Sequence, residues 1–175
     1  MWKRLATREL LSHPRLQIFE DDVELPNGYQ TTYLRFGDDG AVATVLCRDD
    51  AGRILLQRAY SYPPNQVMLE LPGGLVPEGE DPADGANREL MEEAGLRAGR
   101  LTLLGRFFSN NRRSARMTYV YLGEDLTEAS LPGDPEEEIE IAWFTEDEID
   151  ELIRSGQVVN QSVLAAWSLY RARRD

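Results

Sequence analysis

The feature that most constrains this 175-residue chain is a glycine loop followed by a glutamate-rich helix between residues 74 and 96. Asp81 and Pro82 are typical of a helix N-cap and first helical position, and Gly95 is typical of a helix end. These signals predict a helix over about residues 82–94. The glycines and charged residues that stand out in this segment are Gly74, Glu80, Arg88, Glu89, Glu92, Glu93 and Gly95, and an apolar Leu96 follows them.

The predicted helix places three carboxylates within one turn. Residues three and four apart share a helix face, so Glu89, Glu92 and Glu93 repel one another unless cations bind between them. Hard oxygen ligands of this kind suit Mg²⁺ or Mn²⁺, which stabilise charge on a diphosphate and activate bound water. Arg88 lies four residues before Glu92 and is predicted to orient this catalytic group, and the Gly73 carbonyl is a further candidate metal ligand. The alternative is a solvated acidic helix face.

Composition indicates a globular protein, with 42% hydrophobic and 29% charged residues. The net charge of −12 argues against binding to nucleic acid or anionic lipid, and no apolar run reaches membrane-spanning length. Arg8 and Glu9 interrupt the stretch where a secretory signal would need apolar residues. Cys47 is the only cysteine, which excludes an intramolecular disulfide. We therefore expect a cytoplasmic protein.

The remaining patterns predict two domains. Residues 15–25 and 30–36 read as strands joined by a Pro-Asn-Gly turn, giving an N-terminal β-hairpin subdomain over residues 1–38. Further strands are predicted at 41–47, 54–60, 101–108, 117–122 and 139–144. A capping box at Thr145 and Glu148 predicts a second helix ending before Gly156, and residues 162–173 form an amphipathic third. Strands mixed with helices indicate an α/β catalytic domain over residues 39–175.

The loop and helix together match the complete Nudix box, G-x5-E-x7-R-E-U-x-E-E-x-G-U with U apolar, and no position is missing. The chain also resembles the ADP-ribose pyrophosphatase branch of the Nudix hydrolases in residues 23–28, 56–58, 69–74 and 156–167. This resemblance implies an α/β/α sandwich with a mixed sheet, preceded by a small N-terminal β subdomain. It also implies that the subdomain is exchanged between the protomers of a homodimer.

The resemblance implies Mg²⁺-dependent hydrolysis of a nucleoside diphosphate sugar such as ADP-ribose, giving a nucleoside monophosphate and a sugar phosphate. It further implies that Arg58 and Glu70 contact the substrate or its phosphates, with an ordinary strand-edge ion pair as the alternative. The chain departs from this branch at Asn110, where the branch usually has proline, so the choice of substrate stays open. Arg112, Arg113 and Arg116 form a local basic cluster that could hold a terminal phosphate or sugar phosphate, or serve as surface counter-charges.

The group that activates water is expected outside the box, because oxygens that hold a metal are poorly placed to accept a proton. An acidic run follows the Leu131-Pro132-Gly133-Asp134 turn, and the resemblance implies that a loop here brings a glutamate over the metals. We expect Glu137 to be the general base, with Glu136 and Glu138 as the neighbouring alternatives. A solvated acidic loop is the competing interpretation.

Two other functions compete with this hypothesis. A nucleoside triphosphate pyrophosphohydrolase would use the same box and would release inorganic diphosphate. A non-catalytic nucleotide-binding Nudix module would keep the fold but would be expected to lose box carboxylates, and none is missing here.

Overall fold

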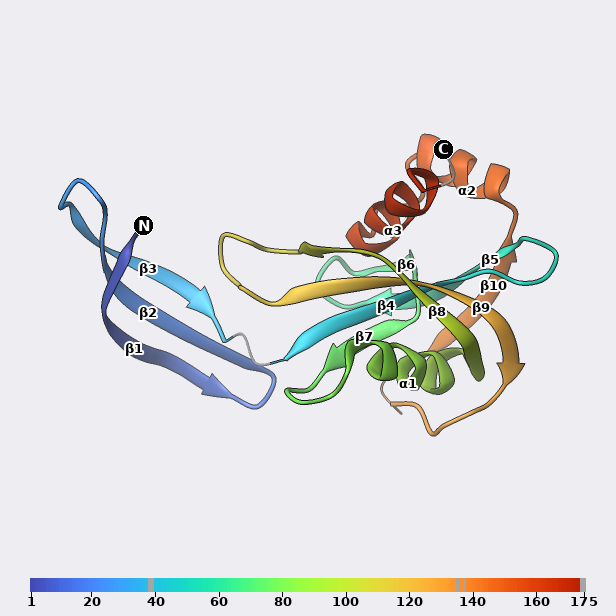
Figure 1. Cartoon of the computed structure of the whole chain (residues 1–175), viewed down its shortest axis with the longest axis horizontal. Helices are drawn as coiled ribbons and strands as arrows, with labels where there is room; N and C mark the ends of the chain where they lie inside the picture. The colour runs from blue at the N-terminus through green and yellow to red at the C-terminus, as the bar shows by residue number, and fades with distance from the viewer. Residues whose placement is uncertain (38–39, 135, 137, 174–175) are drawn as a thin grey trace. The chain divides into compact units, whose positions relative to one another are not determined.

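The computed structural model describes residues 1–37, 40–134, 136 and 138–173 (Figure 1). The chain divides into two compact units. The first contains residues 1–39 and 108–116, and the second contains residues 40–107 and 117–175. The segment 108–116 therefore belongs with the N-terminal strands, although the sequence placed it in the catalytic domain.

The first unit is a three-stranded antiparallel sheet in the order β1-β2-β3. Its strands are β1 (Lys3–His13), β2 (Leu16–Glu24) and β3 (Gln30–Phe36). The predicted β2–β3 hairpin is present, and the sequence analysis missed the third strand, β1. Every residue of β1 is exposed, which removes the alternation of buried and exposed side chains by which a strand is recognised.

Polar contacts hold the first unit together. Asp21, which is buried, accepts hydrogen bonds from Thr7 Oγ1 at 2.6 Å and Arg35 Nε at 2.8 Å. The segment 108–116 is attached to β3 because the Arg113 carbonyl accepts from the Phe36 N–H at 2.7 Å. The Tyr33 hydroxyl also donates to the Arg112 carbonyl at 2.7 Å. Three small strands with few buried apolar residues thus depend on ion pairs and hydrogen bonds.

The second unit contains two sheets. One has the order β7-β4-β9-β8 and the other β10-β5-β6. The strands are β4 (Ala41–Cys47), β5 (Ile54–Ser61), β6 (Gln66–Glu70), β7 (Gly73–Val76), β8 (Leu96–Phe108), β9 (Met117–Glu128) and β10 (Ile139–Phe144). Strand β4 pairs parallel with β9 and antiparallel with β7, which makes that sheet mixed. All five strands predicted for this unit are present, and the short β6 and β7 were missed.

Three helices cover the sheets: α1 (Pro82–Ala94), α2 (Glu146–Arg154) and α3 (Gln161–Arg171). Figure 1 shows α1 on one side of β4 and β9, with α2 and α3 on the other. Alternate side chains of β4 supply both interfaces. Val45 packs in the cluster that contains Leu90 of α1, and Leu46 packs in the cluster that contains Trp167 of α3. The predicted α/β sandwich with a mixed sheet is therefore confirmed.

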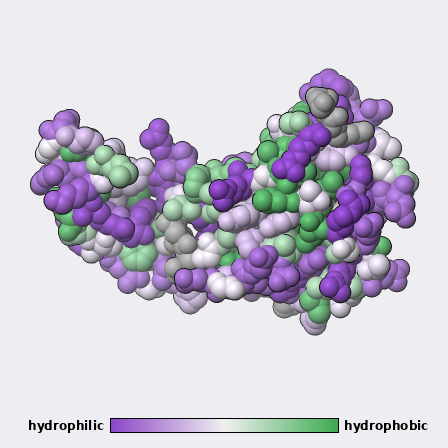
Figure 2. Space-filling view, in the orientation of Figure 1, coloured by the Kyte–Doolittle hydropathy of each residue, from purple (hydrophilic) through white to green (hydrophobic). Residues whose placement is uncertain are grey.

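The helix-end signals are confirmed in detail. Asp81 caps α1 by accepting from the Ala83 N–H at 2.8 Å, and Gly95 ends the helix with a left-handed φ of 66°. Thr145 and Glu148 form both hydrogen bonds of the capping box at α2. In the part of the chain that the structure describes, no helix is long and apolar enough to cross a membrane. Hydrophilic residues cover most of the face drawn in Figure 2, in keeping with the high charge content.

Candidate active site

Two consecutive glycines bring β7 against its neighbours. A Cβ on Gly73, whose φ is +153°, would lie 2.3 Å from the Ala43 carbonyl oxygen and 2.6 Å from Thr44 Cα. A Cβ on Gly74 would lie 2.6 Å from Glu89 Cδ. The backbone of β4 therefore requires glycine at position 73, whereas a side chain at position 74 would displace the Glu89 carboxylate.

Arg88 joins the glycine loop to the carboxylates of α1. Its Nε and Nη2 donate to the two carboxylate oxygens of Glu80 at 3.1 and 3.2 Å, and Nη2 also donates to the Leu75 carbonyl at 3.0 Å. Its Nη1 donates to Glu89 Oε1 at 2.8 Å and to Glu92 Oε2 at 3.1 Å. The hydrogen bond with Glu80, supported by Glu89, raises the pKa of Arg88 above the ordinary arginine value despite its partial burial. Arg88 therefore stays charged and holds three box carboxylates, those of Glu80, Glu89 and Glu92.

Glu93 is held by two N–H donors from other elements. Its Oε2 accepts from the Gly73 backbone N–H at 3.0 Å and from Gln57 Nε2 at 3.1 Å. Gln57 lies on β5 and is 3% exposed. These bonds fix the carboxylate between α1, the start of β7 and β5.

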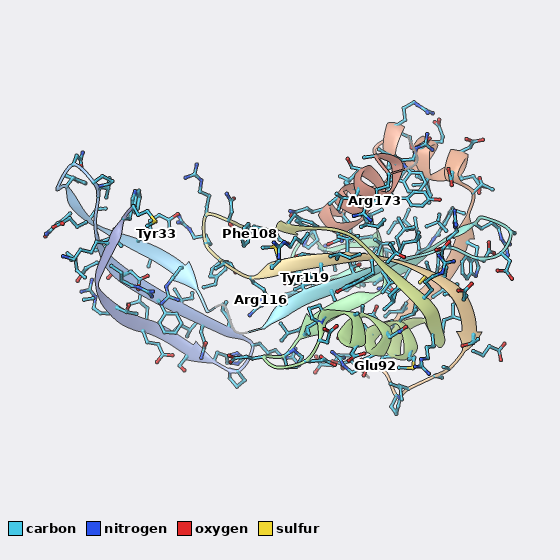
Figure 3. All side chains as sticks on the ribbon, viewed as in Figure 1. Tyr33, Glu92, Phe108, Arg116, Tyr119 and Arg173 are labelled. Carbon is cyan, nitrogen blue, oxygen red and sulfur yellow. The ribbon has the colours of Figure 1, made fainter. Side chains whose placement is uncertain are left out.

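The box carboxylates line one cavity of about 480 Å³. The lining residues are Gly73, Gly74, Leu75, Glu89, Glu92, Glu93, Gly133, Asp134 and Ile139. Glu92, labelled on α1 in Figure 3, keeps 27% of its side chain exposed. The predicted carboxylates and the predicted Gly73 thus come together at one surface.

A second cavity of about 400 Å³ shares Gly73, Glu93 and Ile139 with the first. Its other lining residues are Gln57, Ala59, Tyr60, Ser61, Glu70, Glu136 and Glu138. Glu70 lies opposite Gln57 in the β5–β6 pair, so both side chains are on one face of this ladder. The structure therefore places the predicted Glu70 beside the box.

The segment after β9 runs back along α1. The Ala129 N–H donates to the Gly95 carbonyl at 2.9 Å, and the Leu131 N–H donates to the Met91 carbonyl at 3.1 Å. Gly133 then passes so close to α1 that a Cβ would lie 3.0 Å from the Glu92 carbonyl oxygen. These contacts explain how an acidic segment distant in sequence reaches the cavities. Glu137, the expected general base, lies outside the described residues.

The carboxylates fit a divalent cation in chemistry, although they are not gathered as a preset ligand group. Among the residues with described positions, no three Asp, Glu, His or Cys side chains converge as metal ligands. The hydrogen bonds explain this, because Arg88 holds Glu89 and Glu92 while Gln57 and Gly73 hold Glu93. All three nevertheless present hard anionic oxygens to one cavity, the donor type that Mg²⁺ and Mn²⁺ prefer.

Arg58 is not among the residues that line these cavities. Arg58 is exposed and follows Gln57 directly on β5, so its side chain points to the opposite face of the strand. Arg112 and Arg113 belong to the first unit. There the Arg113 guanidinium lies over the Tyr33 ring, 5.4 Å from its centroid.

Sequence reasoning gave no role to Gln57, Asp134 or Ile139. Gln57 carried a usable signal, because an amide directly follows the apolar Ile54, Leu55 and Leu56 in a strand that is otherwise buried there. The sequence around Asp134 and Ile139 contained no such signal, because these residues reach the cavity only where their segment runs back along α1.

Together the box, its glycine loop and the sandwich define a pyrophosphohydrolase of the Nudix type. The NUDIX domain model matches residues 38–166, and the chain belongs to this family. Among its ADP-ribose pyrophosphatase-like relatives is the ADP-ribose pyrophosphatase of Bacillus subtilis strain 168, which is 31% identical over 158 residues, covering 89% of this chain and 85% of the relative.

Two further comparisons bear on substrate range and fold. The chain is 32% identical over 158 residues to the CMP-5'-(N-acetyl-N-hydroxy-3-aminopropyl)phosphonate hydrolase of Streptomyces rubellomurinus, covering 88% of this chain and 76% of that one. The crystal structure of an ADP compounds hydrolase superposes with a TM-score of 0.89 at 23% identity, covering 98% of this chain and 92% of its own. The fold is thus shared over nearly the whole chain.

Proposed function

We propose that the chain hydrolyses the diphosphate bond of a nucleoside diphosphate sugar such as ADP-ribose. The products would be a nucleoside monophosphate and a sugar phosphate. The observation that carries this proposal is that a carboxylate-lined cavity and a second cavity share Gly73, Glu93 and Ile139. A substrate with groups on both sides of its diphosphate can occupy two adjoining cavities. The relative named as an ADP-ribose pyrophosphatase supports this class of substrate, whereas the relative named as a CMP-phosphonate hydrolase acts on a different compound that also carries a nucleotide.

Mg²⁺ or Mn²⁺ is the proposed cofactor. Glu89, Glu92, Glu93 and the Gly73 carbonyl would hold it, and a bound cation would neutralise phosphate charge and lower the pKa of water. Arg88 keeps Glu89 and Glu92 side by side and presents a permanent positive charge next to them. In the reaction, a water oxygen forms a bond to phosphorus, the bridging P–O bond breaks, and the water proton passes to a base.

We propose that this base comes from the acidic run 136–138, with Glu137 as first choice. Glu136 and Glu138 line the second cavity next to Glu93, which supports a role for this segment. Each of the three glutamates should be changed separately to Gln. Substitution of the glutamate that acts as the base should lower kcat by about 10²- to 10⁴-fold and leave KM and metal affinity nearly unchanged. If all three variants keep kcat within about threefold, the base lies elsewhere.

A substrate screen tests the proposed activity directly. Dinucleotides, nucleotide sugars and nucleoside triphosphates are supplied with Mg²⁺ or Mn²⁺, and added phosphatase reports phosphomonoester products. ADP-ribose or another nucleotide sugar should have the highest kcat/KM. Preferential triphosphate cleavage with release of inorganic diphosphate would instead establish the triphosphate enzyme. Absence of turnover with all substrates would favour a binding module.

Glu93→Gln tests the metal site. The neutral amide keeps the size of the side chain but supplies a weaker metal ligand, so turnover should be mostly lost while the fold survives. Wild-type activity of the folded variant at limiting Mg²⁺ would refute the proposed site.

We also propose that the chain forms a homodimer through its first unit. Strand β1 lies at an edge of the sheet and exposes Leu5, Leu10 and Leu11. An exposed edge strand with apolar side chains is a surface that favours pairing with another chain. Light scattering should give the mass of two chains. A monomer at micromolar concentration, together with full activity after deletion of residues 1–38, would refute this assembly.

A further inference from the structure

Gln57 is a buried amide in an apolar strand. It follows Ile54, Leu55 and Leu56 on β5, each at most 1% exposed, and is itself 3% exposed. The odd residues Leu55 and Gln57 share the strand face that looks toward α1, where Leu55 packs in the cluster with Leu90. A hydrophobic side chain at position 57 would extend this apolar face, so packing alone does not explain why the residue is an amide.

One end of the amide faces a box carboxylate. Gln57 Nε2 donates to Glu93 Oε2 at 3.1 Å, and the same oxygen accepts from the Gly73 N–H at 3.0 Å. An ionised carboxylate only accepts hydrogen bonds, so the NH₂ group, and not the carbonyl oxygen, must face Glu93. The orientation of the Gln57 amide is therefore fixed by its partner.

The other end of the amide is destabilising. Gln57 Oε1 is buried and has no hydrogen-bond partner among the described residues. A buried carbonyl oxygen without a donor loses its hydration without compensation. An apolar side chain of similar length would avoid this loss. A residue that weakens the fold while contacting a functional carboxylate is the kind of local conflict that occurs at functional sites.

We propose that Gln57 is a positioning residue that orients Glu93 for binding the divalent cation. This inference rests on the proposed metal-dependent function. Glu93 is held from β5 by Gln57 and from the loop by Gly73, so loss of the Gln57 bond leaves the carboxylate with one fewer restraint. Outer partners of this kind orient metal ligands, and their removal typically weakens metal affinity or activity about 10- to 100-fold.

The test compares Gln57→Met with the wild-type protein. Methionine has nearly the same length and shape as glutamine but has neither the NH₂ donor nor the unpaired oxygen. Mn²⁺ affinity is measured by electron paramagnetic resonance, without substrate, and thermal unfolding is measured without metal. We expect Mn²⁺ to bind about 10- to 100-fold more weakly, while the metal-free Tm is unchanged or higher.

A matched control is Tyr60→Phe on the same strand. Tyr60 lines the second cavity, but its hydroxyl donates to Asn65 Oδ1 at 2.8 Å rather than to Glu93. This variant should keep wild-type Mn²⁺ affinity. Gln57→Leu provides a second apolar variant if Gln57→Met does not fold, and it should show the same weakening.

The outcomes separate the inference from the proposed function. Tight Mn²⁺ binding by both the wild type and Gln57→Met would refute the positioning role but leave the metal site intact. Failure of the wild type to bind Mn²⁺ would refute the metal site, and the inference with it. A lower metal-free Tm in both apolar variants with unchanged affinity would make Gln57 a purely structural residue.

Discussion

Replacing Gly74 by alanine should move Glu89 without removing it. The added Cβ would lie 2.6 Å from Glu89 Cδ and 2.6 and 2.7 Å from its two carboxylate oxygens, where ordinary contacts lie at 3.4–4 Å. The carboxylate must therefore retreat by about 1 Å, a displacement that can cost about 10²-fold in rate. This corresponds to about 2.7 kcal/mol of transition-state stabilisation. The hydrogen bond from Arg88 Nη1, now 2.8 Å, must shift with it.

The assay is kcat/KM for ADP-ribose with Mg²⁺, with circular dichroism to show that the variant is folded. Gly79→Ala is the matched control in the same loop. Its Cβ would meet nothing within 4 Å, although its φ of +91° makes alanine strained there. The control should lose about 1–2 kcal/mol of stability but keep its kcat/KM. If folded Gly74→Ala keeps kcat/KM within about threefold, Glu89 does not act in the site as argued.

Three further changes test the fold and its ionisable groups. Burial raises the pKa of Cys47 to about 12, so the native thiol should not react with Ellman's reagent at pH 8 until denaturant is added, and rapid native labelling would contradict its burial. Burial opposes ionisation of Asp21, but hydrogen bonds from Arg35 and Thr7 outweigh it and lower its pKa. The resulting stability is present above the unfolded pKa of about 3.9 and is lost as pH falls through the lower folded value. Asp21→Asn should therefore lower Tm at pH 7, and the gap in Tm to wild type should begin to narrow below about pH 4 and close as pH falls past the lowered folded pKa; an unchanged gap would refute the pairing. Thr145→Ala should cost about 0.5–2 kcal/mol in urea unfolding with kcat unchanged, and equal stability would show that the cap at α2 contributes nothing.

Local signals explain why much of the second unit could be predicted from the sequence. Asp81, Pro82 and Gly95 specify the ends of α1 through backbone hydrogen bonds and φ angles that depend on neighbouring residues alone. The continuous apolar run of β4 is equally local, because a strand buried on both faces needs apolar side chains at successive positions. Strand β1 was not predicted because neither of its faces is buried, so its sequence shows no alternation of apolar and polar residues.

The sequence by itself determined the catalytic motif, because the spacing of Glu89, Glu92 and Glu93 on a helix is fixed by helical geometry. Only the tertiary structure decided that Gln57 donates to Glu93, that the segment around Gly133 runs back along α1, and that Arg58 points away from Gln57. These facts depend on which strands pair and which face each side chain occupies, and contacts between residues distant in the chain leave no periodic signal in the sequence.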